Sequence, residues 1–252
     1  MFEVSLDLAV MLIGAAFLAG FVDSIAGGGG LITLPVLLLA GATPLQALST
    51  NKVQGVFGAA TAALSYAASG HVVLRAQLGA AALAFGAGLV GALLVTVLPT
   101  ASLRMALPVV LIGIAGFFAL KKGLDDTDRQ QRIAPATFTA FVVPLIGFYD
   151  GLIGPGAGAF YMIGFVTLAG YGVLKATAHT KLLNFASNLG GLLGFAAAGA
   201  PWWVMGLAMG LAQVAGARLG ARLAMRVGAR VIKPLLVLTS GALALRLIWQ
   251  ML

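Results

Sequence analysis

Long apolar runs, separated by short polar breaks, follow one another along the chain. A hydrocarbon core about 30 Å thick requires roughly 20 apolar residues per helical span, so the pattern predicts membrane helices; the alternation of a membrane β-barrel is absent. The first set of runs covers Leu6 to Val22, Leu31 to Gly41, Ala47 to Ser69, Leu74 to Leu98 and Leu103 to Leu120. The second set covers Ala134 to Tyr149, Ala157 to Gly170, Ala176 to Ala198, Trp202 to Ala224 and Val231 to Leu252.

The first two runs of each set are short, 11 to 17 residues, and meet at a glycine-rich break. Such a pair forms either two full spans or one re-entrant hairpin, and the orientation of later segments is the same in both cases. The sequence therefore predicts an all-α integral membrane protein with about eight to ten membrane segments.

Composition strengthens the membrane assignment and limits the chemistry. Hydrophobic residues make up 61% of the chain and charged residues only 9%, against roughly 25% charged in an ordinary soluble domain. There is no cysteine and there are only two histidines, His71 and His179. We therefore expect no thiol chemistry, no metal site and no bound cofactor beyond a coupling proton or cation.

The net charge of +8 is better explained by membrane orientation than by nucleic-acid binding, because the basic residues lie between apolar runs. Only Arg104 and Arg246 fall at the segment ends that are predicted to face outside. The basic residues of the predicted inner connections are Arg75, Lys121, Lys122, Arg129, Arg132, Lys175, Arg218, Arg222, Arg226, Arg230 and Lys233. The positive-inside rule then places both termini outside, in a membrane of the bacterial inner type.

The two sets of runs share a sequence repeat. The stretch from Gly20 to Gly27 aligns with Gly147 to Gly154, with the aspartates 127 positions apart, and Lys52 matches Lys181 at an offset of 129. Arg104 aligns with Lys233 at the same offset. Five segments in each half make the halves inverted, as in many secondary transporters. We predict an N-terminal repeat over residues 1–124, a cytoplasmic linker over 125–132 and a C-terminal repeat over 133–252.

Each half carries one aspartate and one lysine within its apolar runs, Asp23 with Lys52 and Asp150 with Lys181. An ionisable group inside the bilayer costs at least about 2.5–3.5 kcal/mol and generally faces a partner or a water-filled cavity. The four groups either lock helices together as ion pairs or belong to a substrate site, and these interpretations do not exclude each other. If the four groups belong to a substrate site, the lysines contact an anion. The aspartates, with His179, then carry a coupling proton or pair with the lysines.

A glycine turn follows each aspartate and precedes an apolar helix, so backbone N–H groups at the helix start are free to bind an oxyanion. The turn residues singled out for this role are Gly28, Gly29, Gly30, Gly156 and Ala157. Neutral polar residues near the lysines, which either orient the anion or only join helices, are Asn51, Gln54, Thr180, Asn184 and Asn188.

The stretch from Gly20 to Gly30, then Thr50-Asn51-Lys52, then Gly147 to Gly151 and Thr180-Lys181 resembles the sulfite exporter TauE/SafE family over nearly the whole chain. The resemblance implies a membrane permease of about eight helices that moves sulfite or an organosulfonate. The second half departs from the first at Pro155, Ala157 and Thr180, which puts functional equivalence of the halves in doubt.

The predicted function is alternating-access transport of a small sulfur-containing anion, bound between the two halves and moved across the lipid bilayer. A passive anion channel is the first alternative. An intramembrane aspartyl protease is the second, although the Gly-x-Gly-Asp element expected around its second aspartate is missing. Small-residue faces such as Gly86, Gly88 and Gly91 serve either internal packing or a homodimer.

Overall fold

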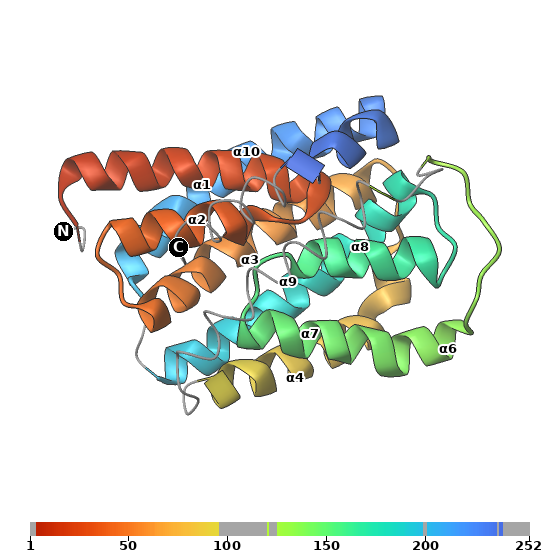
Figure 1. The fold of residues 1–252 in the computed structure, drawn as a ribbon, viewed down its shortest axis with the longest axis horizontal. Helices are drawn as coiled ribbons and strands as arrows, with labels where there is room; N and C mark the ends of the chain where they lie inside the picture. Colours follow the sequence, from red (N-terminus) through yellow and green to blue (C-terminus); the bar gives the residue numbers. More distant parts are fainter. Residues whose placement is uncertain (1–3, 96–119, 121–124, 199–200, 236, 239–252) are drawn as a thin grey trace.

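The computed structural model describes residues 4–95, 120, 125–198, 201–235 and 237–238 of the 252-residue chain. Within these ranges the secondary structure is helical, as predicted. The helices are α1 (Leu6–Ala26), α2 (Gly29–Leu39), α3 (Pro44–Ala68), α4 (Leu78–Val95), α6 (Pro135–Thr137), α7 (Val143–Leu152), α8 (Ala157–Thr167), α9 (Val173–Ala197) and α10 (Trp203–Val227), as labelled in Figure 1. A 3₁₀ turn, Leu74–Gln77, leads into α4, and a π-helical turn, Phe138–Val142, joins α6 to α7.

Local sequence explains where several helices begin and end. Thr43 and Gln46 form a capping box at the start of α3, with Pro44 in the first turn, where its missing N–H costs nothing. Helix α1 ends at Ala26, and Gly27 directly after it adopts a left-handed φ of 73° that most side chains avoid. The break between α1 and α2 is therefore encoded locally.

Four described helices are long and apolar enough to cross a membrane: Leu6–Ala26, Leu74–Val95, Pro135–Leu152 and Trp203–Val227. Helices α3 and α9, with 25 residues each, are equally long but carry the buried polar clusters. Helices α2 and α8 have only 11 residues each, about 16 Å, or roughly half of a hydrocarbon core. They are too short to be full spans.

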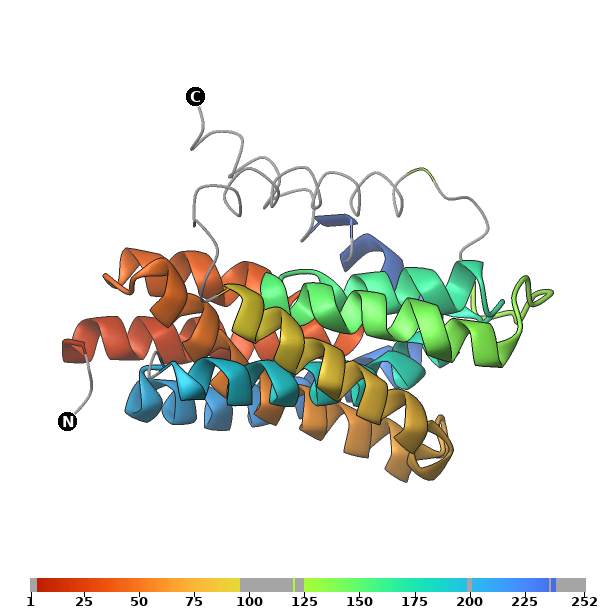
Figure 2. The same cartoon turned by 90° about the horizontal axis from the view of Figure 1, so that it is seen from below.

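The helix pairs α1–α2 and α7–α8 form hairpins that point toward each other from opposite ends of the bundle (Figures 1 and 2). The two tips meet in its interior, where a side chain on Gly27 would overlap the backbone of Gly158. The second hairpin returns to the end where it began, since the N–H of Arg132, just before α6, donates to the carbonyl of Leu168, just after α8. Each glycine-rich pair thus folds as a hairpin, of which only the first arm, Leu6–Ala26 or Pro135–Leu152, is long enough to cross a membrane.

Helices of one half pack mainly on helices of the other half. Helices α1, α3 and α4 occupy the same order in the first half as α7, α9 and α10 in the second. The contact of α1 with α10 corresponds to that of α7 with α4, and the contact of α3 with α10 corresponds to that of α9 with α4. Helices α3 and α9 contact each other at the centre. This reciprocal exchange is what two inverted repeats produce, but the repeat and its limits at 124 and 133 stay predictions. The predicted segment Leu103–Leu120, except Leu120, and most of Val231–Leu252 lie outside the described residues, as do Arg104, Lys121, Lys122 and Arg246.

Glycines let α4 and α7 approach to backbone contact. A Cβ on Gly151 would overlap the carbonyl of Gly88, and one on Gly91 would overlap the carbonyl of Phe148. By contrast, Gly86 has open space where a Cβ would lie. Gly88 and Gly91 therefore serve internal packing, the first of the two uses that the sequence left open.

The connection that enters the second half is tied to the helices beside it. The carboxylate of Asp126 accepts hydrogen bonds from the N–H groups of Leu174 and Ala229, both at 2.9 Å. Asp128 accepts from the N–H of Gly172 at 2.8 Å and pairs with Lys175 at 2.5 Å. The Gly172 N–H and the Lys175 ammonium hold the pKa of Asp128 below its usual range. These contacts gather the predicted inner linker and the start of α9 at one end of the bundle.

Candidate functional site

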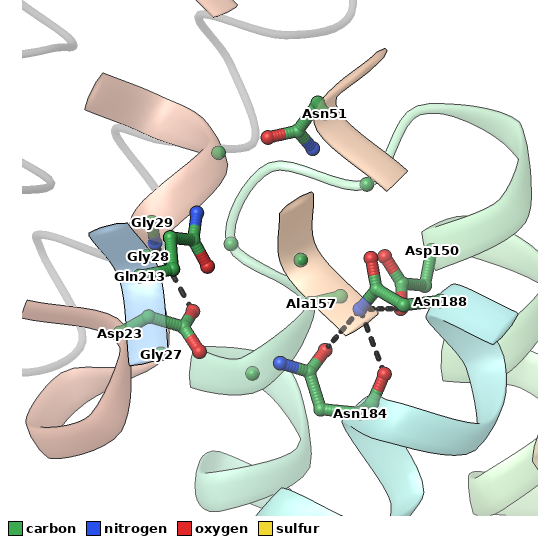
Figure 3. Close-up of a pocket in the computed structure, with 15 residues that line it drawn as sticks. Asp23, Gly27, Gly28, Gly29, Asn51, Asp150, Ala157, Asn184, Asn188 and Gln213 are labelled. Carbon is green, nitrogen blue, oxygen red and sulfur yellow. Dashed lines mark hydrogen bonds between the residues drawn. The ribbon is translucent and has the colours of Figure 1, made fainter. Parts of the chain in front are cut away.

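A pocket lies where the two hairpin tips meet (Figure 3). Its empty volume is about 380 Å³, which includes space open to solvent and is therefore an upper bound on the room for a ligand. The lining comes from both halves and consists of small and polar residues. They are Asp23, Gly27, Gly28, Gly29, Gly30, Asn51, Gly55, Asp150, Gly154, Gly156, Ala157, Gly158, Asn184, Asn188 and Gln213.

Asp23 enters the pocket from the last turns of α1. Its Oδ1 accepts a hydrogen bond of 3.1 Å from the N–H of Gly29, the first residue of α2. The carboxylate therefore sits at the positive end of the α2 dipole, one of the two positions where the sequence predicted an anion site. Its side chain is only partly buried.

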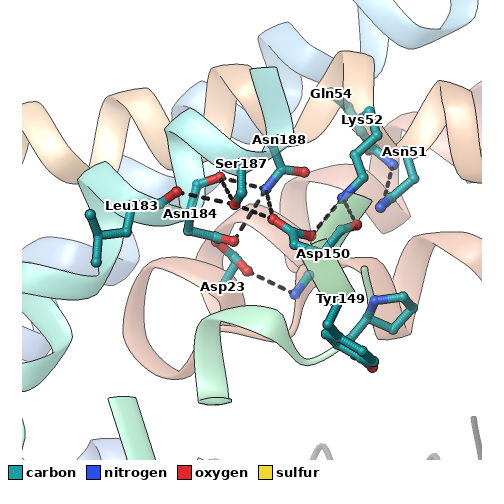
Figure 4. Close-up of polar contacts among 12 residues, drawn as sticks. Asp23, Asn51, Lys52, Gln54, Tyr149, Asp150, Leu183, Asn184, Ser187 and Asn188 are labelled. Carbon is teal, nitrogen blue, oxygen red and sulfur yellow. Dashed lines mark hydrogen bonds and ion pairs between the residues drawn. The ribbon is translucent and has the colours of Figure 1, made fainter. Parts of the chain in front are cut away.

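Asp150, from α7, is held far more tightly (Figure 4). Its Oδ1 pairs with the ammonium of Lys52 at 2.5 Å, and both side chains are almost inaccessible, with 1% and 2% exposure. Its Oδ2 accepts from Ser187 Oγ at 2.5 Å and from Asn188 Nδ2 at 3.2 Å. Both oxygens of this carboxylate thus have close donors from α3 and α9.

The two lysines lie behind the pocket instead of lining it. Lys52 Nζ also donates to the backbone carbonyl of Asp150 at 2.5 Å, and Lys181 Nζ donates to the backbone carbonyl of Asp23. Each lysine thus fastens the hairpin tip of the other half. Both ammonium groups are therefore bound to residues that line the pocket, while neither lysine is itself part of the lining, and the direct contact with an anion stays a prediction.

Amide side chains form two groups on opposite sides of the pocket. Asn51 Oδ1 accepts from Thr33 Oγ1 at 2.7 Å and from Gln54 Nε2 at 3.3 Å, and Gln213 Nε2 donates to Gln54 Oε1 at 3.1 Å. On the other side, Asn188 Nδ2 donates to Asn184 Oδ1 at 3.2 Å. These buried bonds orient the amides toward the pocket and satisfy groups that would otherwise be costly to bury.

Besides the two lysines, three residues that the sequence singled out do not line the pocket. Gln54 lies behind Asn51, and the hydroxyl of Thr180 donates to the carbonyl of Ala176 within α9. His179 packs on Tyr171, with ring centroids 4.9 Å apart, and its Nδ1 lies 2.9 Å from the carbonyl of Lys175. This places His179 beside the loop end of α9, so the geometry gives it no contact with a pocket ligand.

The structure also brings in residues that sequence reasoning missed. Gln213 is the clearest, and a signal for it was available, because it is the single polar residue in the apolar stretch from Trp203 to Ala217 of α10. Gly55 was invisible in sequence: it gives room to Asn188, whose Oδ1 lies where a Cβ would be. The other lining glycines outside the predicted set are Gly27, Gly154 and Gly158.

The arrangement is not that of a hydrolytic or metal centre. Within the described residues, no three His, Cys, Asp or Glu side chains converge as ligands for a metal ion. An aspartyl protease needs two carboxylates that share a proton, whereas both oxygens of Asp150 are already bound to Lys52, Ser187 and Asn188. The chemistry available is polar binding of a small solute between two helix starts.

Comparison with known proteins places this geometry in a family. The model of the sulfite exporter TauE/SafE family matches residues 12–247. A probable membrane transporter protein, ORF9, of a Sinorhizobium species is 55% identical over 246 residues, which cover 98% of this chain and 94% of that protein. The probable membrane transporter protein YfcA of Escherichia coli K12 is 43% identical over 250 residues, 99% of this chain and 93% of its own.

A probable membrane transporter protein of Haemophilus influenzae is 37% identical over 248 residues, 98% of this chain and 97% of that protein. No solved structure matches the chain. The family match and these full-length relatives agree with the helical architecture, with four helices able to cross a membrane. This chain is therefore a multi-pass membrane transporter and belongs to the sulfite exporter TauE/SafE family.

Proposed function

We propose that this protein is a secondary transporter of a small oxyanion, with sulfite as the first substrate to test, and that the pocket between the hairpin tips is its binding site. The observation that carries the proposal is the meeting of two half-length helices, α2 and α8, whose glycine-rich starts face one pocket from opposite ends of the bundle. Helix starts of this kind bind anions without any basic side chain.

Donors are available at both helix starts. In the part of the chain described, the N–H groups of Gly30 and Gly158 donate to no other backbone or side-chain acceptor. Both glycines line the pocket, together with the amides of Asn51, Asn184 and Gln213. An anion with several oxygens, such as sulfite, matches a set of donors that converge from two sides.

The lining also limits the substrate class. Among the described residues, it contains no aromatic side chain and no apolar side chain larger than that of Ala157. Apolar parts of ligands are usually held by hydrophobic and aromatic side chains. A compact inorganic oxyanion therefore fits this pocket better than an organosulfonate with an alkyl chain, and we place organosulfonates second.

The two hairpins suggest how the site alternates between the two sides. Each tip is fastened to the other half through a lysine, Lys52 or Lys181, so movement of one half carries the tip of the other with it. We propose a rocking movement that exposes the pocket first on one side and then on the other. In this proposal the protein lies in a bacterial inner membrane with both termini outside, as the distribution of basic residues favours.

The test is counterflow of labelled sulfite in proteoliposomes that contain the full chain. Proteoliposomes that contain a carrier and are preloaded with unlabelled sulfite take up labelled sulfite transiently, at a rate that saturates with its concentration. Proteoliposomes with a passive channel do not. We expect Asn184→Ala to lower the flux several-fold, because it removes a pocket donor. Gln130→Ala, at an exposed position of the linker, is the matched control and should transport like the wild type. Absence of saturable flux of sulfite and of organosulfonates in the wild-type protein would refute the proposal.

A further inference from the structure

The two equivalent aspartates differ in how many partners they have. Asp150 holds Lys52 on one oxygen and Ser187 and Asn188 on the other. The carboxylate of Asp23 accepts a single hydrogen bond, from the N–H of Gly29, and among the described residues it forms no ion pair. Lys181, the counterpart of Lys52, reaches only the backbone carbonyl of Asp23. One carboxylate is saturated with donors, and the other is open to the pocket.

The sequence repeat explains the difference. At the offset of 129 that aligns Lys52 with Lys181, the counterparts of Asn184, Ser187 and Asn188 are Gly55, Gly58 and Ala59. The donors that hold Asp150 therefore have no equivalents beside Asp23. The space left by the small residues is used differently, since Gly58 accommodates the amide of Gln213 and Gly55 accommodates Asn188. The difference in hydrogen bonding between the two aspartates therefore comes from the different residues of α3 and α9, because the aspartates themselves are equivalent in the repeat.

The charged and titratable groups around Asp23 come from three neighbouring helices. Helix α9 contributes Lys181, α7 contributes Asp150 across the pocket, and α3 contributes Tyr66, whose hydroxyl donates to the carbonyl of Ser24 at 3.0 Å. Helices α2 and α8 carry no charged side chain, and the arginines of α10 are exposed, so α10 presents the neutral Gln213. The single cation near Asp23 in the described structure is thus Lys181, bound to the backbone and not to the carboxylate.

We propose that Asp23 takes up the proton that accompanies the transported anion, while Asp150 stays ionised as a fixed anchor of the hairpin tip. This inference rests on the proposed function. Ionised Asp23 occupies the start of α2 and competes with a substrate anion for the N–H of Gly29. A proton from the open side neutralises the carboxylate, the anion takes its place, and both leave on the other side. Proton and anion therefore move together, one for one.

Asp150 is unsuited to this role for a geometric reason. Its protonation would leave the buried ammonium of Lys52 without a counter-charge, and it would weaken the hydrogen bonds from Ser187 and Asn188, because a neutral carboxyl group is a poorer acceptor than a carboxylate. Asp23 makes none of these contacts, so its protonation releases one backbone N–H and nothing else in the described structure. The charge balance also favours a proton, because the two aspartates and two lysines already cancel before an anion enters.

The first experiment uses infrared difference spectroscopy of the membrane-reconstituted full chain, and it needs no transport. We expect a protonated-carboxyl band that grows as the pH falls, and that grows further when sodium sulfite is added. The band should be absent from Asp23→Asn and retained in Asp150→Asn. A band that persists unchanged in Asp23→Asn overturns the proposal. If Asp150→Asn does not fold, the comparison of wild type with Asp23→Asn is sufficient by itself.

The second experiment measures the pH dependence of sulfite counterflow. Coupling of one proton to one anion makes the apparent affinity fall by up to roughly tenfold per pH unit on the alkaline side of the titration. Because sulfite itself titrates near neutral pH, the comparison is between proteins at each pH. The ratio of wild-type to Asp23→Asn affinity should change several-fold with pH. A constant ratio overturns the proposal.

The two proposals fail in different ways. Wild-type protein without saturable flux for any of the anions refutes the transport proposal, while the infrared band still reports on Asp23. Saturable flux with the same pH profile in wild type and Asp23→Asn refutes the coupling role and leaves the transport proposal intact.

Discussion

The tips of the two hairpins are built from equivalent residues but are held differently. At the α7–α8 tip, Asp150 is fixed through its side chain by Lys52, Ser187 and Asn188, and through its carbonyl by Lys52 again. At the α1–α2 tip, Lys181 fastens the backbone of Asp23 but leaves the carboxylate to the N–H of Gly29. The common element of the two tips is a lysine from the other half on the backbone carbonyl of the aspartate.

This difference separates a structural role from a functional one within a single repeated motif. The lysine-to-carbonyl contact appears in both halves, which indicates that it holds the hairpins in place. The donors to the carboxylate of Asp150, from Lys52, Ser187 and Asn188, have no counterpart at Asp23, so they serve a role that belongs to the second half alone. Equivalent positions in a repeat therefore need not share a role, and the helix that faces each aspartate decides.

The largest expected effect comes from breaking the saturated tip. Lys52→Ala leaves the buried carboxylate of Asp150 without its cation, and removal of one member of a buried pair costs about 3–5 kcal/mol. Lys181→Ala removes a hydrogen bond to a backbone carbonyl and should cost less, on the order of 1–3 kcal/mol. Thermal unfolding of both variants in detergent compares them. Equal losses of stability would contradict the described difference between the tips.

An intermediate effect should follow when the saturated tip is made more like the open one. Asn188→Ala removes one donor from Asp150 and places alanine where the first half has Ala59. We expect a loss of about 1–2 kcal/mol, because a buried hydrogen bond is removed. We also expect a new protonated-carboxyl band from Asp150 in the infrared spectrum. Leu193→Ala, at an exposed position of the same helix, is the control for truncation in α9. Wild-type stability and spectrum in Asn188→Ala would show that these donors are not what hold Asp150 ionised.

The smallest effect should come from an exposed charge pair, which gives a reference for the buried one. Asp128 has a lowered pKa in the folded state, because of the Gly172 N–H and Lys175, so it stabilises the fold above the ordinary aspartate pKa. This contribution disappears as the pH falls through the folded-state pKa. Asp128→Asn should therefore lower stability by less than about 1 kcal/mol at neutral pH and by nothing in strong acid. Melting temperatures at the two pH values test this, and a deficit that grew in acid would reverse the expected sign.

Much of the site was predictable because the membrane makes polar residues conspicuous. Asp23, Asp150, the glycine turns, Asn51, Asn184 and Asn188 were all singled out from sequence, and all of them line one pocket. A charged or amide side chain inside an apolar run has few explanations, since burying it in lipid is costly. Gln213 had the same signal in α10 but lay outside the aligned motifs.

The placement of the lysines was not predictable in the same way. Lys52 and Lys181 were expected either to contact an anion or to lock helices together as ion pairs with the aspartates. In the structure Lys52 pairs with Asp150 of the other half, and both ammonium groups also bind backbone carbonyls, those of Asp150 and Asp23. A lysine side chain is long and flexible, so its position in sequence does not fix where its charge ends. His179 illustrates the same limit, because its ring packs on Tyr171 away from the pocket.

The sequence by itself determined the class of protein, the segments that the structure describes, the two hairpin breaks and the ionisable groups, because hydrophobic runs and glycine turns act over short stretches of chain. Tertiary structure alone decided which aspartate is saturated and which is open. That choice depends on Ser187 and Asn188 of α9 and on Lys52 of α3, which are distant in sequence from Asp150 and come within hydrogen-bonding distance of it only when the helices pack together. Asp23 keeps only its local bond to the N–H of Gly29.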